Sequence, residues 1–194
     1  MPSNAPLGWH SRGYLPHLDA LGELQALTFR LADSVPDKVI KAWKQELDSS
    51  PPKAAAIALQ RKIATYEDAG HGSCLLRIPE HAEVVQNALL HFDGTRYRLL
   101  EWAVMPNHVH VLVQPLNDRL GRIIKSWKTY TARAINQATG TSGTLWARDY
   151  HDRYIRDEEH LLNCRNYIRM NPVKAGLCTT PEAWPFSSAS RDHQ

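Results

Sequence analysis

The chain contains no long hydrophobic run and few cysteines, and each shortage excludes certain classes of protein. Its longest apolar stretches, such as 54–59 and 109–113, are only a few residues long, whereas a membrane-spanning helix needs about 20. The N-terminus lacks the basic start and apolar core of a secretory signal. The three cysteines form no Cys-x-x-Cys pair, which argues against a disulfide framework and a cysteine-rich zinc site. We therefore expect a cytoplasmic protein without a membrane partner.

Length and composition are those of one globular domain. The chain has 194 residues, of which 43% are hydrophobic and 22% are charged, as in ordinary folded domains. The first segment, 1–20, is rich in Pro, Gly and Asn, and we expect it to form a loosely ordered arm. A single domain is expected over 21–188, followed by a tail at 189–194.

Acidic residues are scarce in one half of the chain. The segment 94–176 contains 13 Lys and Arg against 7 Asp and Glu, within a chain whose net charge is only +3. Such a basic segment favours a polyanionic partner, with nucleic acid first among the candidates. The alternative is a solvated surface that happens to be rich in arginine.

The spacing of apolar residues predicts an α+β domain. Alternation predicts strands at 24–31, 97–104 and 108–114 and part of one within 145–155; helical spacing predicts helices at about 33–47, 54–67, 79–89, 120–137 and 157–171. The short connection Met105-Pro106-Asn107 makes the second and third strands a hairpin. Pro172 is expected to end the last helix at Asn171, because proline disfavours helix in the residue before it. This order suits helices packed on an antiparallel sheet.

Two histidines share one face of the predicted strand at 108–114. Side chains alternate along a strand, so Val109, Val111 and Val113 are expected on a buried face and His108 with His110 on the other. Two imidazoles at this spacing can reach one divalent ion, although two ligands do not complete a site. The alternative is an inert pair, since His-x-His sequences are common.

The last predicted helix carries a polar stripe beside its apolar one. The stripe contains His160, Asn163, Tyr167 and Asn171, and the last two lie one turn apart, where they can address the same point. A tyrosine hydroxyl becomes a nucleophile only when a metal or a cationic pocket helps it to lose its proton. Alternatively, Tyr167 packs at the core margin and Asn171 simply ends the helix.

The predicted helix at 120–137 contains the competing tyrosine. Tyr130 is assigned to an apolar, core-facing stripe with Ile123, Trp127 and Ala134, and we interpret it as structural. The opposite stripe, which could follow a phosphate backbone or simply be solvated, contains Arg122, Lys125, Ser126, Thr129 and Arg133.

The segment 146–156 places three aromatic residues between three arginines. Aromatic rings can stack on unpaired bases, and arginines can hold phosphates.

Several motifs in this chain together resemble one family. The motifs, which occur in the family order, are at 12–17, 28–31, 105–110, 127–133, 146–156, 167–176 and 184–188. The sequence resembles the REP-associated tyrosine transposases, which are single-tyrosine HUH nucleases of the IS200-like type. The most specific feature is His108-Val109-His110 followed by Tyr-Ile-x-x-Asn-Pro-Val-Lys-Ala-Gly at 167–176.

The resemblance implies a fold, a site and a substrate. The fold would be a ferredoxin-like antiparallel sheet with helices packed on one side, carrying a helical insertion near 34–68. His108, His110 and Asn171 would bind Mg²⁺ or Mn²⁺ as a Lewis acid for the scissile phosphate. Tyr167 would be the nucleophile that forms a 5′-phosphotyrosine.

The implied partners are single-stranded DNA and DNA hairpins formed by repetitive extragenic palindromes (REP), bound by a monomer or homodimer. The expected DNA-binding residues are Arg122, Lys125, Lys128, Arg133, Arg148, Arg153 and Arg156. Two other functions remain open at this point. One is a non-catalytic regulator that binds hairpins, and the other is a histidine–metal hydrolase with a water nucleophile.

Overall fold

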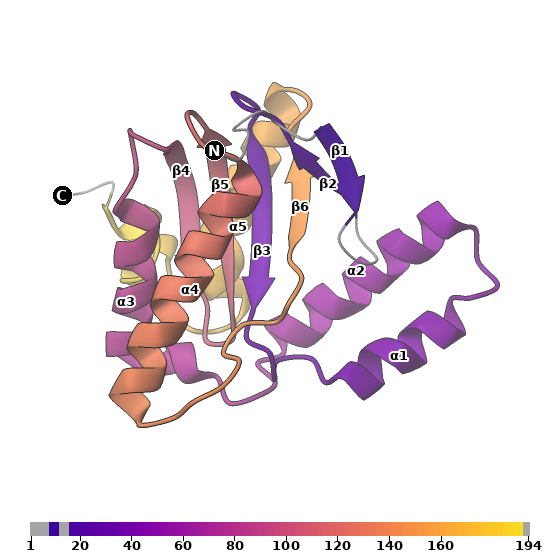
Figure 1. Ribbon diagram of the computed structural model, residues 1–194, viewed down its shortest axis with the longest axis horizontal. Coiled ribbons are helices and arrows are strands. Elements are labelled where there is room, and N and C mark those ends of the chain that lie inside the picture. The colour runs from indigo at the N-terminus through magenta and orange to yellow at the C-terminus, as the bar shows by residue number, and fades with distance from the viewer. Residues whose placement is uncertain (1–7, 12–15, 192–194) are drawn as a thin grey trace, which may run out of the picture.

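A four-stranded antiparallel sheet organises the chain (Figure 1). In this computed structural model, which describes residues 8–11 and 16–191, the strand order is β4-β5-β3-β6. The strands are β3 Gln25–Arg30, β4 Tyr97–Val104, β5 His108–Pro115 and β6 His151–Tyr154. The predicted α+β class is confirmed. So is the hairpin across 105–107, since β4 and β5 pair antiparallel on either side of it.

Strand β5 lies in the middle of the sheet, and its register with β3 positions the later site. Thr28 pairs with His110, and Arg30 pairs with His108. Val109, Val111 and Val113 are fully buried on one face of β5, as the alternation predicts. The histidines therefore point to the other face.

Helices cover both faces of the sheet. Helices α3 Pro79–Leu90 and α4 Leu120–Thr139 pack against the valine face of β5, where Ile123 and Trp127 join the main core. Helix α5 Glu158–Lys174 lies behind the sheet in Figure 1. Its Ile168 packs with Leu112 of β5 in a second hydrophobic core. The expectation of helices on one side thus describes α3 and α4, whereas α5 covers the opposite face.

Helix α5 does not end where the sequence predicts. It continues through Pro172 to Lys174, three residues past the expected end at Asn171. Proline removes one backbone donor and strains the preceding turn, but here both Asn171 and Pro172 are buried. The Leu177 N–H donates to the Pro172 carbonyl at 2.9 Å. Tertiary packing therefore outweighs the local preference.

The two helices of the 34–68 segment form an arm that projects from the sheet (Figure 1). They are α1 Asp37–Glu46 and α2 Pro52–Asp68. Trp43 and Tyr66 hold them together with ring centroids 5.6 Å apart. At the base of the arm, the Asn107 side-chain amide donates to the Glu67 and His71 carbonyls at 3.1 and 2.9 Å. This tether brings the C-terminal end of α2 beside the first residue of β5.

The chain ends are more regular than expected over the residues that the structure describes. Strands β1 Gly8–Ser11 and β2 Pro16–Asp19 pair antiparallel within the segment predicted to be loosely ordered. Short 3-10 turns occur at η1 Leu75–Arg77, η2 Pro181–Ala183 and η3 Ala189–Arg191, and the last lies in the expected tail. Residues 1–7, 12–15 (most of the first motif) and 192–194 lie outside the described residues. No helix among the described ones is long and apolar enough to cross a bilayer.

Candidate active site

His108 and His110 converge beneath α5. Both are buried, with 1% and 4% of their surfaces exposed, and their Nε2 atoms lie 2.9 Å apart. The Asn107 amide nitrogen already donates to backbone carbonyls, so its Oδ1, 2.7 Å from His108 Nδ1, must accept. His108 therefore carries its proton on Nδ1, which leaves the Nε2 lone pair facing His110. Thr28 Oγ1 contacts His110 Nδ1 at 2.9 Å and can fix the same tautomer there.

Burial keeps both imidazoles neutral. It lowers the pKa of His108 well below its ordinary value and the pKa of His110 to about 3, with a smaller contribution from a neighbouring histidine in each case. Neutral imidazole is the form that binds a metal. The pair therefore needs no proton loss at physiological pH before it can act as a ligand set.

Asp68 supplies a third donor that sequence reasoning missed. Its Oδ1 lies 3.7 Å from His108 Nε2, and one ligand atom from each of Asp68, His108 and His110 lies within 4.8 Å of the others. Two neutral imidazoles and one carboxylate suit a divalent transition ion such as Mn²⁺. The residues present thus fit the implied metal. The only sequence cue was that Asp68 directly follows the helix predicted at 54–67, within a segment of unassigned role.

Tyr167 and Asn171 meet at this site. The Tyr167 ring, 38% exposed, lies with its centroid 5.3 Å from that of His110. Burial, followed by the charge of Asp68, raises the pKa of Tyr167 to about 12, and a hydrogen bond from the buried Asn171 side chain opposes this rise. The phenol is therefore protonated at neutral pH. The Lys174 ammonium stands 5.5 Å from the Tyr167 ring centre, within cation–π range.

A buried glutamate anchors α5 on both sides of Tyr167. Glu101 of β4, with no exposed surface, accepts from Arg165 Nε at 2.7 Å and from Arg169 Nε at 2.9 Å. Ser188 Oγ donates to the same carboxylate at 2.5 Å. Because the two arginines lie two residues before and after Tyr167, this contact fixes the rotation of the helix. Sequence reasoning did not identify Glu101.

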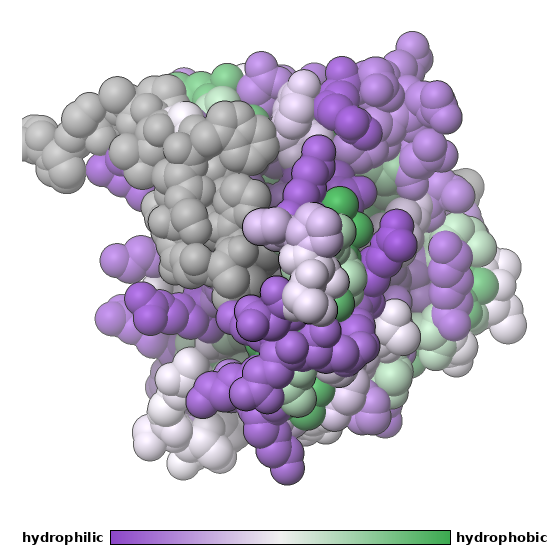
Figure 2. All heavy atoms as spheres, turned by 90° about the vertical axis from the view of Figure 1, so that its right-hand side faces the viewer, coloured by the Kyte–Doolittle hydropathy of each residue, from purple (hydrophilic) through white to green (hydrophobic). Residues whose placement is uncertain are grey.

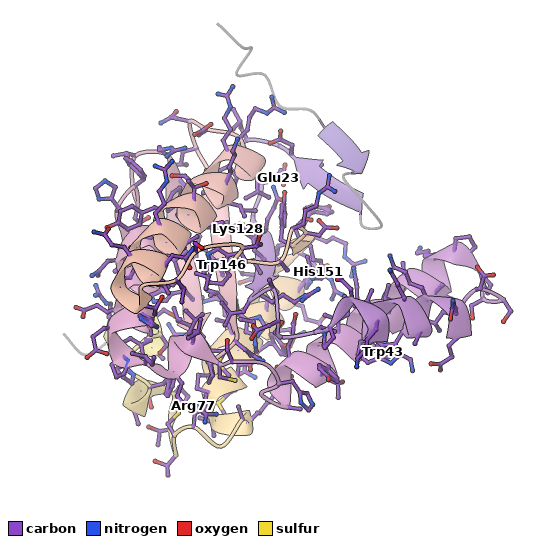
Figure 3. All side chains as sticks on the ribbon, turned by 60° about the horizontal axis from the view of Figure 1, so that its bottom comes forward. Glu23, Trp43, Arg77, Lys128, Trp146 and His151 are labelled. Carbon is purple, nitrogen blue, oxygen red and sulfur yellow. The ribbon has the colours of Figure 1, made fainter. Side chains whose placement is uncertain are left out.

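The polar stripe of α5 lines a cleft of about 490 Å³ between α2, α5, β3 and β6. His160, Asn163 and Tyr167 open into it, together with His110 from the centre of the sheet. In Figure 3, His151 of β6 lies at the root of the arm, on the side away from Lys128 and Trp146. Figure 2 shows that the coloured part of the side to which the arm projects is mostly hydrophilic, with small hydrophobic patches between hydrophilic residues.

The seven expected DNA-binding residues do not form one surface. Arg122, Lys125 and Arg133 are on α4, across the sheet from the histidines. Arg153 lines the cleft, whereas Arg148 and Arg156 are exposed on the segments that flank β6.

Lys128 is engaged with the protein backbone. Its Nζ donates to the carbonyls of Ala147 and Arg148 at 2.6 and 3.2 Å, and burial lowers its pKa to about 8. These contacts favour a structural role for Lys128 and leave its expected contact with phosphate untested.

Two aromatic assignments need revision. Tyr130 is 60% exposed, so its placement on the core-facing stripe was wrong; the buried stripe of α4 continues from Trp127 through Thr131 to Ile135. Trp146 and Tyr150, by contrast, are buried, at 4% and 8% exposure. They pack in the main core, which covers most of their surface. Tyr150 also contributes to the lining of the cleft.

Comparison with known proteins places this geometry in a family. Residues 77–171 match the family model "Transposase IS200 like". A REP-associated tyrosine transposase of Escherichia coli is 24% identical over 111 residues, 57% of this chain and 66% of that protein. A Haemophilus influenzae protein named "Putative REP-associated tyrosine transposase" is 34% identical over 100 residues, 46% of this chain and 57% of that protein. The chain thus spans about half to two thirds of the length of these curated relatives.

A solved structure shares the fold. It is a REP-associated tyrosine transposase bound to a REP hairpin. It superposes with a TM-score of 0.59 at 18% identity, covering 91% of this chain and 82% of that chain. The segment matched to the family contains His108, His110, Tyr167 and Asn171 but not the arm with Asp68. Over residues 77–171, nearly half of its length, this chain therefore matches the IS200-like transposase family.

Proposed function

We propose that this chain cleaves and rejoins single-stranded DNA beside REP hairpins through a covalent bond to Tyr167. The observation that carries the proposal is the contact of the Tyr167 ring with His110, one of two buried histidines whose Nε2 atoms converge. A tyrosine hydroxyl beside a convergent donor set is what nucleophilic attack on a phosphodiester requires. A relative crystallised with a REP hairpin supports the choice of substrate.

The chain's own residues prepare the step. His108, His110 and Asp68 would hold Mg²⁺ or Mn²⁺, with Asn171 as a further expected ligand, and the ion would supply Lewis-acid stabilisation of the scissile phosphate. Asn171 also orients the Tyr167 hydroxyl through their hydrogen bond. Glu101 holds α5, and hence Tyr167, against the sheet.

In the proposed reaction, the Tyr167 oxygen attacks phosphorus in line and forms a new P–O bond. The bond between phosphorus and the 3′ oxygen of the preceding nucleotide breaks, and that oxygen leaves with one proton in place of the proton that the phenol loses. The products are a 5′-phosphotyrosine and a free 3′-OH. Since the phosphodiester energy is retained in the tyrosine ester, attack by a 3′-OH reverses the step without ATP.

The direct test uses single-stranded DNA that carries a REP hairpin, labelled at either end and incubated with Mn²⁺. We expect metal-dependent cleavage on a denaturing gel, lost with His108→Ala and kept with His91→Ala, an exposed histidine at the end of α3. Binding without cleavage would favour the non-catalytic regulator. Cleavage without a protein–DNA adduct would favour the hydrolase with a water nucleophile.

A further inference from the structure

We infer that the cleft between α2 and α5 receives one unpaired nucleobase next to the scissile phosphate, so that the arm takes part in choosing the cleavage site. This inference rests on the proposed function and adds a substrate contact to it. The cleft of about 490 Å³ is large enough for a nucleotide-sized ligand. It lies outside the segment matched to the family on its α2 side, because that match begins at residue 77.

The cleft is continuous with the proposed reaction centre. Tyr167 and His110 both line it, and their ring centroids are 5.3 Å apart. A phosphate at the Tyr167 hydroxyl therefore has one of its two neighbouring nucleotides within reach of the cleft. In duplex DNA that base would be stacked and paired, so only an unpaired nucleotide can enter.

The walls provide apolar surface on opposite sides. Ile57, Ile63 and Ala64 come from α2, while Ile168 comes from α5 and Ala26 from β3. Ile57 is 41% exposed, which leaves an apolar side chain at the cleft that a flat ring could cover. Apolar and aromatic walls of this kind bind bases through their faces, largely independent of base identity.

Polar groups are placed where they can orient such a ring. Arg30 and Glu67 also line the cleft, with Arg30 Nε 3.4 Å from Glu67 Oε1 and with only 12% and 5% of their side chains exposed. Together they present guanidinium donors and a carboxyl group, which are groups that read base edges. Arg61 of α2 and Arg153 of β6, both exposed, supply positive charge for the backbone phosphates.

The same arrangement explains what the arm contributes. Helix α2 supplies six of the lining residues, namely Ile57, Gln60, Arg61, Ile63, Ala64 and Glu67. Asp68, the next residue, lies beside His108. Helix α2 thus forms a wall of the cleft and also carries a ligand of the candidate metal site. A base bound in the cleft and a metal ion bound at the site would therefore contact the same helix.

The test is an abasic scan with two matched variants. Tyr167→Phe protein, which binds without reacting, is titrated by fluorescence anisotropy with hairpin DNA that lacks one base at each position around the cleavage site. Ala64→Trp fills the cleft, while Ala134→Trp places the same ring on another half-buried helical alanine, on α4. Thermal unfolding of each variant checks that it is folded.

We expect one position next to the cleavage site at which base removal weakens binding roughly tenfold. In Ala64→Trp protein that dependence disappears, and in Ala134→Trp it stays. The inference is overturned if no single position matters, or if Ala64→Trp keeps the full dependence. Wild-type cleavage on the same oligonucleotides separates the two claims: cleavage without a sensitive position rejects only the cleft, whereas a sensitive position without cleavage rejects only the catalytic proposal.

Discussion

Replacing Glu101 by glutamine tests the anchor that holds α5 and Tyr167. The substitution keeps the side-chain shape but removes the charge that Arg165 and Arg169 share at 2.7 and 2.9 Å. Removing one partner of a buried ion pair costs about 3–5 kcal/mol. The two arginines are 43% and 29% exposed, so water can solvate part of their charge. We therefore expect a loss of about 2–3 kcal/mol in the free energy of unfolding.

Urea unfolding at pH 7 measures this loss, with Glu83→Gln as the control. Glu83 lies exposed on α3, and its replacement should change stability by about 0.5 kcal/mol or less. Cleavage by the folded Glu101→Gln protein should also slow, since α5 loses its fixed rotation. A stability change as small as that of the control would refute the anchoring argument.

The remaining predictions concern the metal, the substrate and the half-buried Lys128. His110→Ala should abolish cleavage yet leave hairpin binding largely intact in gel-shift assays. Full cleavage by this variant would show that the metal site has been assigned to the wrong residues. Asp68→Ala should weaken Mn²⁺ binding roughly tenfold or more by isothermal titration, while Asp48→Ala in the arm loop should not, and equal affinities would remove Asp68 from the ligand set. Binding should prefer single-stranded or hairpin DNA over blunt duplex and fall steeply with salt; a flat salt response would contradict the role of the arginines. Burial lowers the pKa of Lys128 to about 8 from 10.5, so the unfolded chain holds that proton at higher pH and stability should rise from about pH 8 to 10.5. Lys128→Met should flatten the rise in urea unfolding, and an unchanged slope would contradict the shift.

Local patterns were sufficient to predict the strand and helix that carry the proposed chemistry. Alternation placed His108 and His110 on one face of β5, because the period of a strand is set by its backbone. Helical spacing brought Tyr167 and Asn171 together one turn apart. These relations involve residues close in sequence, so they hold whatever the rest of the chain does.

The relations that the sequence did not reveal are long-range. Asp68 lies beside His108 because long-range contacts, among them those of the Asn107 amide, tie the end of α2 to the start of β5. Glu101 meets its arginines across more than 60 positions of sequence. Such pairs depend on how the elements pack, and a single residue pattern carries no trace of that packing.

Two local predictions failed because tertiary packing decided them. Pro172 is tolerated inside α5, since its turn is buried and its carbonyl accepts from Leu177. Tyr130 was placed on the core side because it lies three residues after Trp127. In the structure the next buried residue of α4 is Thr131, four residues after Trp127. Both steps are compatible with a helix, and the packing of α4 into the core, where Trp146 Nε1 donates to Thr131 Oγ1, selects one.

The most direct test of the account is the identity of the residue that becomes linked to DNA. Wild-type protein is incubated with labelled hairpin DNA and Mn²⁺, denatured, digested and examined by mass spectrometry for a tyrosine-linked nucleotide. Tyr167→Phe and Tyr130→Phe are treated in the same way. Because phenylalanine keeps the ring, each variant tests the hydroxyl alone.

We expect a denaturant-resistant band in which the nucleotide is attached to Tyr167. That band should be absent from Tyr167→Phe protein and unchanged in Tyr130→Phe protein, whose substituted ring is exposed on α4, across the sheet from the histidines. An adduct on Tyr130, or one that persists in Tyr167→Phe protein, would contradict the assignment of the nucleophile and the role proposed for Asn171 beside it.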